Sequence, residues 1–101
     1  MEAFEKMIKN TKAKGSRNER RGMAYFNSQG YSCTKSGASL GVFDFIGIGK
    51  RDIIAVQVKS NRRPSPEEIK IIRDFQGPIN FKKYIMVYRD WVKDPIVEEI
   101  V

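Results

Sequence analysis

Two apolar runs joined by a short polar turn constrain the fold of this 101-residue chain more than any other feature. Residues 42–48 (VFDFIGI) and 53–59 (IIAVQVK) are each typical of a largely buried strand. The intervening residues 49–52 (GKRD) are typical of a turn, because glycine and charged residues tolerate its backbone and its exposure. The pattern predicts a β-hairpin in which Ile48 lies opposite Ile53.

The register of this hairpin determines which polar side chains meet. With Ile48 opposite Ile53, Asp44 lies opposite Gln57, and residues that are paired across two strands share a face. Gln57 and Lys59 also share a face, because successive strand residues point to opposite sides of the sheet. We therefore expect an acid, an amide and an ammonium group to lie together on an otherwise apolar sheet.

The other elements are predicted from periodicity and from capping patterns. A basic linker is expected at residues 12–15 (KAKG), and Ser16 with Glu19 has the spacing of a capping box at a helix start. Ser65 with Glu68 repeats that spacing around a proline at the first helical position. The remaining predicted elements are a short helix at 2–11, a helix from 16 to about 29, a strand at 31–35, a loop at 36–39, a helix from 65 to about 77, a strand at 84–88, and an edge strand or packed tail at 96–101. Helix, three strands, helix and strand make a small α/β fold.

Composition narrows the function classes. The chain is long enough for one domain with one hydrophobic core, and its 19 basic and 12 acidic residues give a net charge of +7, which favours a polyanionic partner. It contains no histidine, so histidine-based catalytic triads and Cys/His zinc sites are excluded. A single cysteine, Cys33, suits a reducing cytoplasm and is expected to be a small core residue. Neither a transmembrane stretch nor a signal peptide is present in the sequence, so a cytoplasmic location is expected.

Three segments, KGSRNER, SLGVFD and QVKS, resemble in order and spacing the PD-(D/E)xK nuclease superfamily, and most closely its archaeal Holliday junction resolvases. This superfamily places a glutamate early in its first core helix, an aspartate on its second strand and a carboxylate-x-lysine motif on its third. Glu19, Asp44 and Lys59 match those positions, and Ser39 matches a serine that the resolvases keep five residues before the aspartate. The resemblance implies a restriction-endonuclease-like αβββαβ core, with a mixed central sheet flanked by helices, over residues 14–101.

Residues 1–13 then form an N-terminal extension, and two positions depart from the family pattern. Gln57 replaces the carboxylate that precedes the lysine, and Phe43 replaces the proline. The resemblance implies a Mg²⁺ ion, for which Mn²⁺ would substitute, because hard cations prefer oxygen ligands. Its expected ligands are the Asp44 carboxylate, the Gln57 side-chain carbonyl, the Val58 backbone carbonyl and, directly or through a water, Glu19. With Gln57 in place of an acid, we expect weaker metal binding than with a full acidic set, and a second tightly bound ion is less expected.

Every residue in this set also has a structural explanation. Asp44 could be a strand-edge or turn acid, Lys59 could extend from a strand end into solvent, and Gln57 could make a purely structural hydrogen bond. Glu19 could serve only the capping box, and Ser39 could be an ordinary loop residue. In the functional interpretation, Lys59 orients the attacking water or stabilises charge on the phosphate, and Asp44 is the central metal ligand.

The basic residues are predicted to contact DNA phosphates without reading sequence, and they are Arg17, Arg20, Arg21, Lys35, Lys50, Arg51, Arg62 and Arg63. The preferred interpretation is a Mg²⁺-dependent, structure-selective DNA endonuclease, and the resemblance implies a homodimer that resolves four-way junctions. Two alternatives remain open at this point. One is another PD-(D/E)xK DNA nuclease, such as a flap, nicking or general nuclease. The other is a nucleic-acid-binding protein that has the same fold but no catalytic activity.

Overall fold

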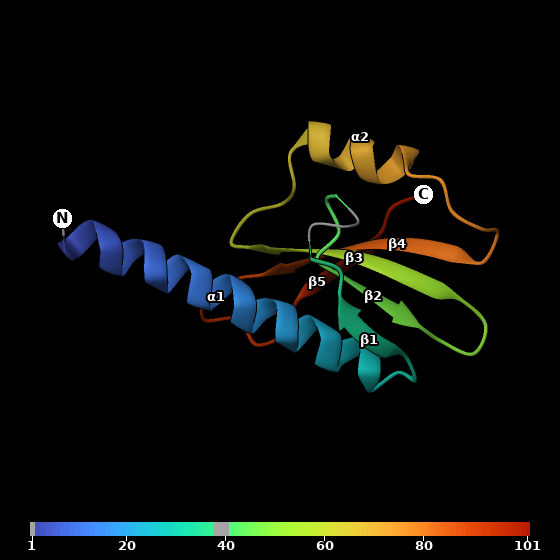
Figure 1. Ribbon diagram of the computed structural model, residues 1–101, viewed down its shortest axis with the longest axis horizontal. Coiled ribbons are helices and arrows are strands. Elements are labelled where there is room, and N and C mark those ends of the chain that lie inside the picture. The colour runs from blue at the N-terminus through green and yellow to red at the C-terminus, as the bar shows by residue number, and fades with distance from the viewer. Residues whose placement is uncertain (1, 38–40) are drawn as a thin grey trace.

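The fold is a five-stranded mixed sheet with one helix on each face (Figure 1). The computed structural model describes residues 2–37 and 41–101, and the side chains from residue 14 onward. The elements are α1 (Glu2–Asn27), β1 (Ser32–Lys35), β2 (Phe45–Ile48), β3 (Ile53–Ser60), α2 (Pro66–Asp74), β4 (Phe81–Tyr88) and β5 (Ile96–Glu99). The predicted α/β class with a mixed sheet is confirmed, and the predicted edge strand at the end of the chain is β5.

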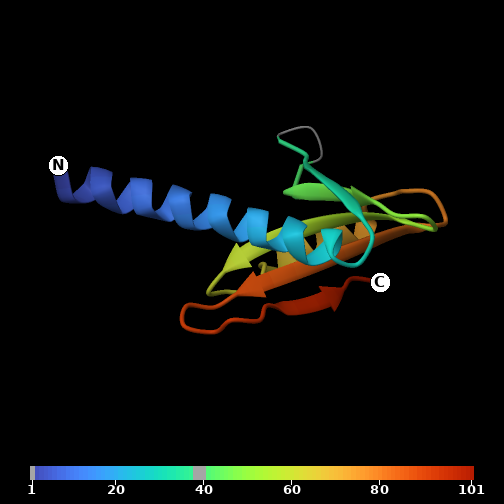
Figure 2. The ribbon, with the colours of Figure 1, turned by 90° about the horizontal axis from the view of Figure 1, so that it is seen from below.

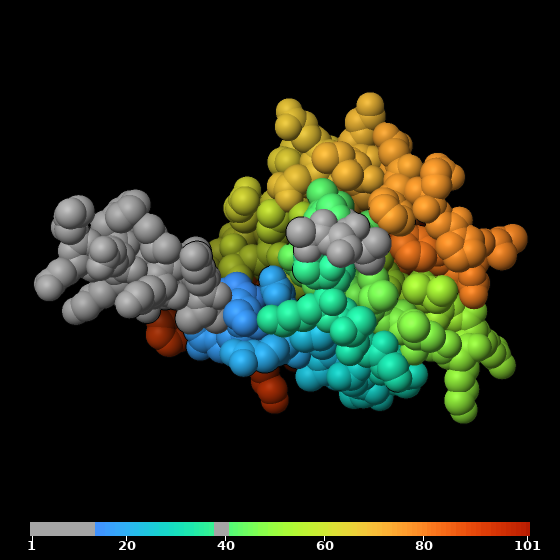
Figure 3. Space-filling view, viewed as in Figure 1, coloured from blue at the N-terminus to red at the C-terminus, as the bar shows by residue number. Residues whose placement is uncertain are grey.

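The strands lie in the order β1-β2-β3-β4-β5, and all neighbours are antiparallel except β3 and β4. A parallel pair needs a crossover connection, and α2 provides it on one face of the sheet. Helix α1 crosses the other face, and its N-terminal part projects beyond the sheet (Figure 2). In the space-filling view α1 and α2 lie on opposite sides of the molecule (Figure 3).

Helix α1 is one continuous helix, which corrects the prediction of a linker at residues 12–15 and of a helix start at Ser16. The single glycine there, Gly15, costs an α-helix about 1 kcal/mol, too little to break it between helix-favouring lysine, alanine and arginine residues. Further along, Gly22 lets the helix approach the sheet closely. A Cβ atom at this position would lie 3.1 Å from the sulfur of Met86 and 3.1 Å from the ring of Phe45.

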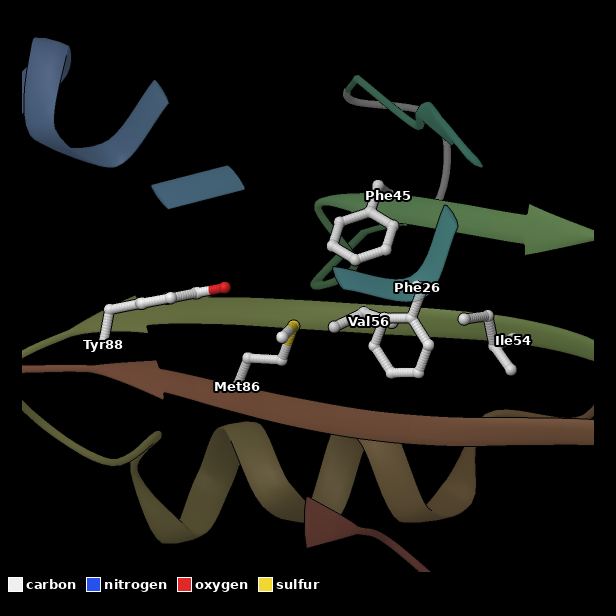
Figure 4. Packing of buried hydrophobic residues seen from close by; sticks show 6 residues of the cluster. All are labelled: Phe26, Phe45, Ile54, Val56, Met86 and Tyr88. Atoms are coloured by element: carbon white, nitrogen blue, oxygen red, sulfur yellow. The ribbon is translucent and has the colours of Figure 1, made fainter. Parts of the chain in front are cut away.

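The two faces of the sheet bury separate hydrophobic clusters. Beneath α1, the cluster consists of Phe26, Phe45, Ile54, Val56, Met86 and Tyr88 (Figure 4). Beneath α2, it consists of Phe43, Ala55, Ile69, Ile72, Ile85 and Ile100. Because β3 contributes alternate residues to the two clusters, both of its faces are buried, as expected for a central strand with a continuous apolar sequence.

The start of α2 is a complete capping box, as predicted. The Ser65 side chain accepts a hydrogen bond from the Glu68 backbone amide, and the Glu68 side chain accepts one from the Ser65 amide. The helix ends at Asp74, three residues before the predicted Gly77, because Phe75 takes an extended backbone conformation and packs its ring edge-on against Phe43.

The predicted hairpin register is confirmed from the Ile48–Ile53 pair to the Phe45–Val56 pair. The next predicted pair, Asp44 with Gln57, is not formed. The Asp44 amide also donates to the Val56 carbonyl, at 2.8 Å, so two residues of one strand oppose a single residue of the other, as in a β-bulge. The extra residue reverses the alternation of side chains. Phe43 and Phe45 consequently point to opposite faces of the sheet.

Candidate active site

The polar cluster predicted from the hairpin lies at the C-terminal end of β3, under the first turn of α2. Gln57 is 5% exposed, and its Nε2 donates a hydrogen bond of 2.8 Å to Glu68 Oε2. The Lys59 ammonium lies 2.8 Å from the same carboxylate oxygen. Gln57 and Lys59 share a face of the sheet, as predicted from strand periodicity, and Glu68 joins them from the helix.

The bulge brings Asp44 to the same end of β3. Its Oδ2 accepts a hydrogen bond of 2.7 Å from the Val58 amide. Partial burial raises the pKa of the Asp44 carboxyl, the Val58 hydrogen bond lowers it, and the charge of Glu19 raises it. The charge of Lys59 lowers the same pKa and that of Glu68 raises it, so both groups also lie within electrostatic range. Asp44 therefore meets β3 through the backbone of Val58 instead of through the predicted pairing with Gln57.

Glu19 lies well within the length of α1, and its charge acts on Asp44. Its Oε2 lies 3.6 Å from the Lys35 ammonium, and Lys35 also donates to the Ser16 hydroxyl at 3.4 Å. Since Ser16 is inside the helix, the capping explanation of Glu19 is wrong. Ser39, the remaining predicted catalytic residue, lies outside the described residues.

Glu68 is the member of this cluster that sequence reasoning missed. Its capping role accounts fully for a glutamate at that position, so nothing about the residue alone suggested a second role. Only two sequence features taken together could have indicated its role. Gln57 is an amide where an acid is expected, and Glu68 is an acid at the start of the helix that follows the same strand. The Lys59 hydrogen bond, followed by that of Gln57, lowers the pKa of Glu68 to about 2 despite partial burial.

The cluster offers oxygen atoms that fit a hard cation. The Gln57 Oε1 atom is buried without a hydrogen-bond partner, because the amide nitrogen of that side chain is turned toward Glu68. A buried carbonyl without a donor is uncommon and is satisfied by a cation or a water molecule. Among the described residues, no three acidic or cysteine side chains lie close enough together to hold a metal ion between them. The unbonded Gln57 oxygen and the Asp44 carboxylate would suit a single cation that retains several water ligands.

The predicted DNA contacts do not form one surface. Arg17 and Arg21 line a hollow between α1 and the β4–β5 loop. Lys50 and Arg51 lie at the β2–β3 turn, and β3, eight residues long, separates them from Lys59 by about 26 Å. The other four are Arg20 and Lys35, both exposed, and Arg62 and Arg63, which follow β3. Arg63 forms a two-oxygen ion pair with Glu98 of β5, at 2.9 Å to each oxygen.

Cys33 is half-buried and packs against the cluster beneath α1, as expected of a small core residue. Burial raises the pKa of its thiol. Across residues 2–37 and 41–101, no helix combines the length and the apolar character needed to cross a membrane.

Comparison with known proteins shows the fold. No protein-family model and no curated protein sequence matches the chain. Among solved structures, it is similar to Hjc, a Holliday junction resolvase from the archaeal hyperthermophile Archaeoglobus fulgidus, with a TM-score of 0.68 and 18% sequence identity. The match covers 86% of this chain and 73% of the resolvase. The mixed five-stranded sheet with its two helices is thus the fold of that structure.

Proposed function

We propose that this protein is a Mg²⁺-dependent, structure-selective DNA endonuclease whose preferred substrate is a four-way junction. The observation that carries the proposal is the cluster at the end of β3: the buried, unbonded Gln57 carbonyl oxygen beside Lys59, Glu68 and the bulged Asp44. The similarity of the whole fold to a Holliday junction resolvase supports it, as does the net charge of +7.

Residues at the C-terminal end of β3 would bind one metal ion. Asp44, the Gln57 side-chain carbonyl and the Val58 backbone carbonyl would hold it, with Glu19 reached directly or through a water. Bound there, Mg²⁺ would neutralise charge on the scissile phosphate and lower the pKa of a coordinated water. Mn²⁺, which also accepts oxygen ligands, would substitute. Lys59 supplies the local positive charge: its ammonium donates hydrogen bonds, orients the attacking water and stabilises the negative charge of the phosphate.

Glu68 restores the charge that Gln57 removes. The usual carboxylate-x-lysine motif places its acid on the strand, whereas here the acid comes from the first turn of α2 and lies 2.8 Å from both the Gln57 amide and the Lys59 ammonium. In this position Glu68 orients the amide so that its carbonyl oxygen faces away, and it holds Lys59 in place. We assign Glu68 as a positioning residue that acts through Gln57 and Lys59.

The proposed enzyme works as a homodimer in the cell, cutting DNA during recombination and repair. Two active sites related by a two-fold axis would make paired nicks in a junction, whose arms have the same symmetry. Exposed basic side chains such as Arg20 and Arg62 would bind backbone phosphates and position the arms.

The test is cleavage of labelled four-way junction, flap, single-stranded and duplex DNA with Mg²⁺ or Mn²⁺, with a chelator as the control. Paired symmetric nicks in the junction that disappear in chelator are the expected result. Metal-dependent cleavage of another DNA form, with the junction left intact, would support the nuclease activity but show that the four-way junction is not its substrate. Binding without metal-dependent cleavage of any form would refute the nuclease.

A nucleic-acid-binding protein without catalysis is the second candidate, and two observations favour it. The strand position that carries an acid in the nuclease motif holds Gln57, and the described residues contain no three-acid cluster. This candidate predicts DNA affinity that falls with salt and is indifferent to chelator, together with uncut DNA in every form tested.

A further inference from the structure

A basic hollow lies between α1 and the β4–β5 loop, on the face of the sheet away from Gln57 and Glu68. Its volume is about 300 Å³, which is at the lower end of the range for small-molecule sites. Its charged lining consists of Lys14, Arg17, Arg21, Arg89 and Lys93, with the single acid Asp90. In Figure 3 red atoms of the C-terminal part of the chain protrude from behind the blue atoms of α1.

The loop is held in place against its surroundings. Arg21 donates a hydrogen bond of 2.9 Å to the Lys93 carbonyl oxygen, and its guanidinium lies 4.3 Å from the centre of the Tyr88 ring. Lys14 forms a 2.9 Å ion pair with Asp90. The Asp90 backbone amide donates a hydrogen bond of 2.7 Å to the side chain of Asn61, which follows β3 directly. The hollow is thus a formed feature of the fold, with two of its cations used to fix it.

Two guanidinium groups of the hollow are available for a ligand. Neither Arg17 nor Arg89 forms an ion pair or a side-chain hydrogen bond with any described residue. Guanidinium groups bind phosphate oxygens through paired N–H donors, so this pair suits a phosphate.

The rim of the hollow carries Trp91, the only tryptophan of the chain. Its side chain is 103% exposed, and its backbone has a φ of 68°, a left-handed conformation that bulky residues rarely adopt. The loop therefore holds a large apolar ring in water at a conformational cost, an arrangement that concentrates at functional sites. A flat indole next to unpaired guanidinium groups matches the two parts of a nucleotide, its base and its phosphate.

We propose that this hollow is a subsite for an unpaired nucleotide of DNA, with the base stacked on Trp91 and the phosphate bound by Arg17 and Arg89. Inside a duplex both faces of a base are covered by its neighbours, so only an unpaired or frayed base can stack on the indole. The subsite therefore recognises DNA with unpaired nucleotides, such as a single-stranded arm, or with bases that fray at the centre of a branch.

The subsite adjoins the proposed active site through α1 and β3. Asn18, which lines the hollow, donates a 2.6 Å hydrogen bond to Ser60, and Ser60 follows Lys59 directly. A strand bound in the hollow would continue past the end of β3 toward Lys59. This part of the inference rests on the proposed nuclease function, whereas the binding of an unpaired nucleotide does not.

The test uses the full chain in chelator, so cleavage plays no part. The fluorescence of Trp91 is titrated with single-stranded DNA, a four-way junction and a blunt duplex of equal length. We expect quenching by the first two and little by the duplex. The Trp91 variants lack tryptophan, so their binding is followed by the fluorescence anisotropy of labelled single-stranded DNA. Trp91→Ala should weaken single-strand binding about 5- to 150-fold, the range of base–aromatic stacking, and Trp91→Phe should retain most of it. Ile79→Ala, which removes a side chain as exposed (106%) but outside the hollow, should change nothing.

Three results would overturn the subsite. The first is a Trp91→Ala protein that binds single strands as the wild type does, with its fold verified by circular dichroism. The second is equal quenching by the intact duplex. The third is Trp91 emission that depends on protein concentration without DNA, which would assign the indole to contact with a second copy. The titration contains no metal, so it measures nucleotide binding whether or not the protein cleaves DNA. A negative result in the titration would likewise leave the proposed nuclease activity untouched.

Discussion

At the residue scale, the carboxylate of Glu68 links the start of α2 to the end of β3. One oxygen accepts from the Ser65 backbone, and the other accepts from the Gln57 amide and the Lys59 ammonium. Hydrogen bonds to an ionised group stabilise its charged form, so they lower the pKa of Glu68 to about 2.

Glu68→Gln should reduce the stability of the metal-free protein and change its dependence on pH. Because the pKa falls from 4.5 to about 2 on folding, the stabilisation is complete above pH 4.5 and is lost as the pH falls to about 2. We expect a loss on the order of 1–3 kcal/mol at pH 7 that shrinks over this window, measured by urea unfolding in chelator. The control is Glu67→Gln, which removes the neighbouring acid of the same helical turn. Equal pH profiles for the two variants would contradict the assignment.

Gln57→Glu should make the protein dependent on metal. The new carboxylate would lie against Glu68, whose oxygen is 2.8 Å from the present Gln57 amide nitrogen, and two like charges this close repel each other. We expect a lower melting temperature in chelator and a larger rise on adding Mn²⁺ than the wild type shows. Gln29→Glu, at an exposed position, is the matched control. A variant as stable as the wild type in chelator would contradict the expected charge repulsion between positions 57 and 68.

The positions of the site residues were predicted from the alternation of side chains along a strand. Alternation along β3 correctly places Gln57 and Lys59 on one face, because the strand is regular and fully paired. Asp44 deviates from its predicted pairing because a bulge inserts one residue, and bulges have no reliable pattern in a single sequence. Glu68 was missed because its local role as a cap is complete without any tertiary contact.

At the element scale, α1 shows how two glycines in one helix have opposite effects. Gly15 has no atom within 4 Å of the place where a Cβ would be, whereas at Gly22 the Cβ would press on Phe45 and Met86. The helix therefore tolerates Gly15 and requires Gly22.

Gly15→Ala should stabilise the protein by about 0.5–1 kcal/mol, because alanine favours the helix and meets no neighbour. Gly22→Ala should destabilise it by about 1 kcal/mol net, since overpacking beside a fully buried phenylalanine outweighs the same helical gain. Denaturant unfolding of the two variants side by side measures both effects. Destabilisation by Gly15→Ala would argue for the predicted linker in place of the continuous helix.

The elements that were predicted well are those with strong local signals. The capping box and the proline define the start of α2, and continuous apolar residues define β3. The break expected in α1 was wrong because glycine and a serine–glutamate pair are only weak stop and start signals inside a long run of helix formers. Tertiary packing then decided the outcome.

At the scale of the whole molecule, the parallel pair β3–β4 and its crossover helix determine where the site lies. The crossover brings the first turn of α2 to the C-terminal end of β3, where ligand sites of α/β sheets usually form. The order of elements predicted an α/β fold and the resemblance implied a mixed sheet, but neither specified this parallel pair. The arrangement of the basic residues could not be predicted, because it depends on which loops fold back, as the β4–β5 loop does onto α1.

Asp44 is the residue on which the proposed active site depends most, and Asp44→Asn tests its role while keeping an oxygen for the Val58 amide. The variant removes a charge that is costly to bury, since burial raises the pKa of the carboxyl above its ordinary value. In chelator the protein should therefore be as stable as the wild type, or more stable, at neutral pH, where the carboxylate is ionised.

The decisive measurement is single-turnover cleavage of a labelled four-way junction in Mg²⁺ by the wild type and Asp44→Asn, at protein concentrations that bind equal fractions of the DNA. We expect the variant to cut at least about 100-fold more slowly while its affinity for the junction is unchanged. Equal cleavage rates for the two proteins would contradict the assigned active site, and no cleavage by the wild type would contradict the nuclease itself.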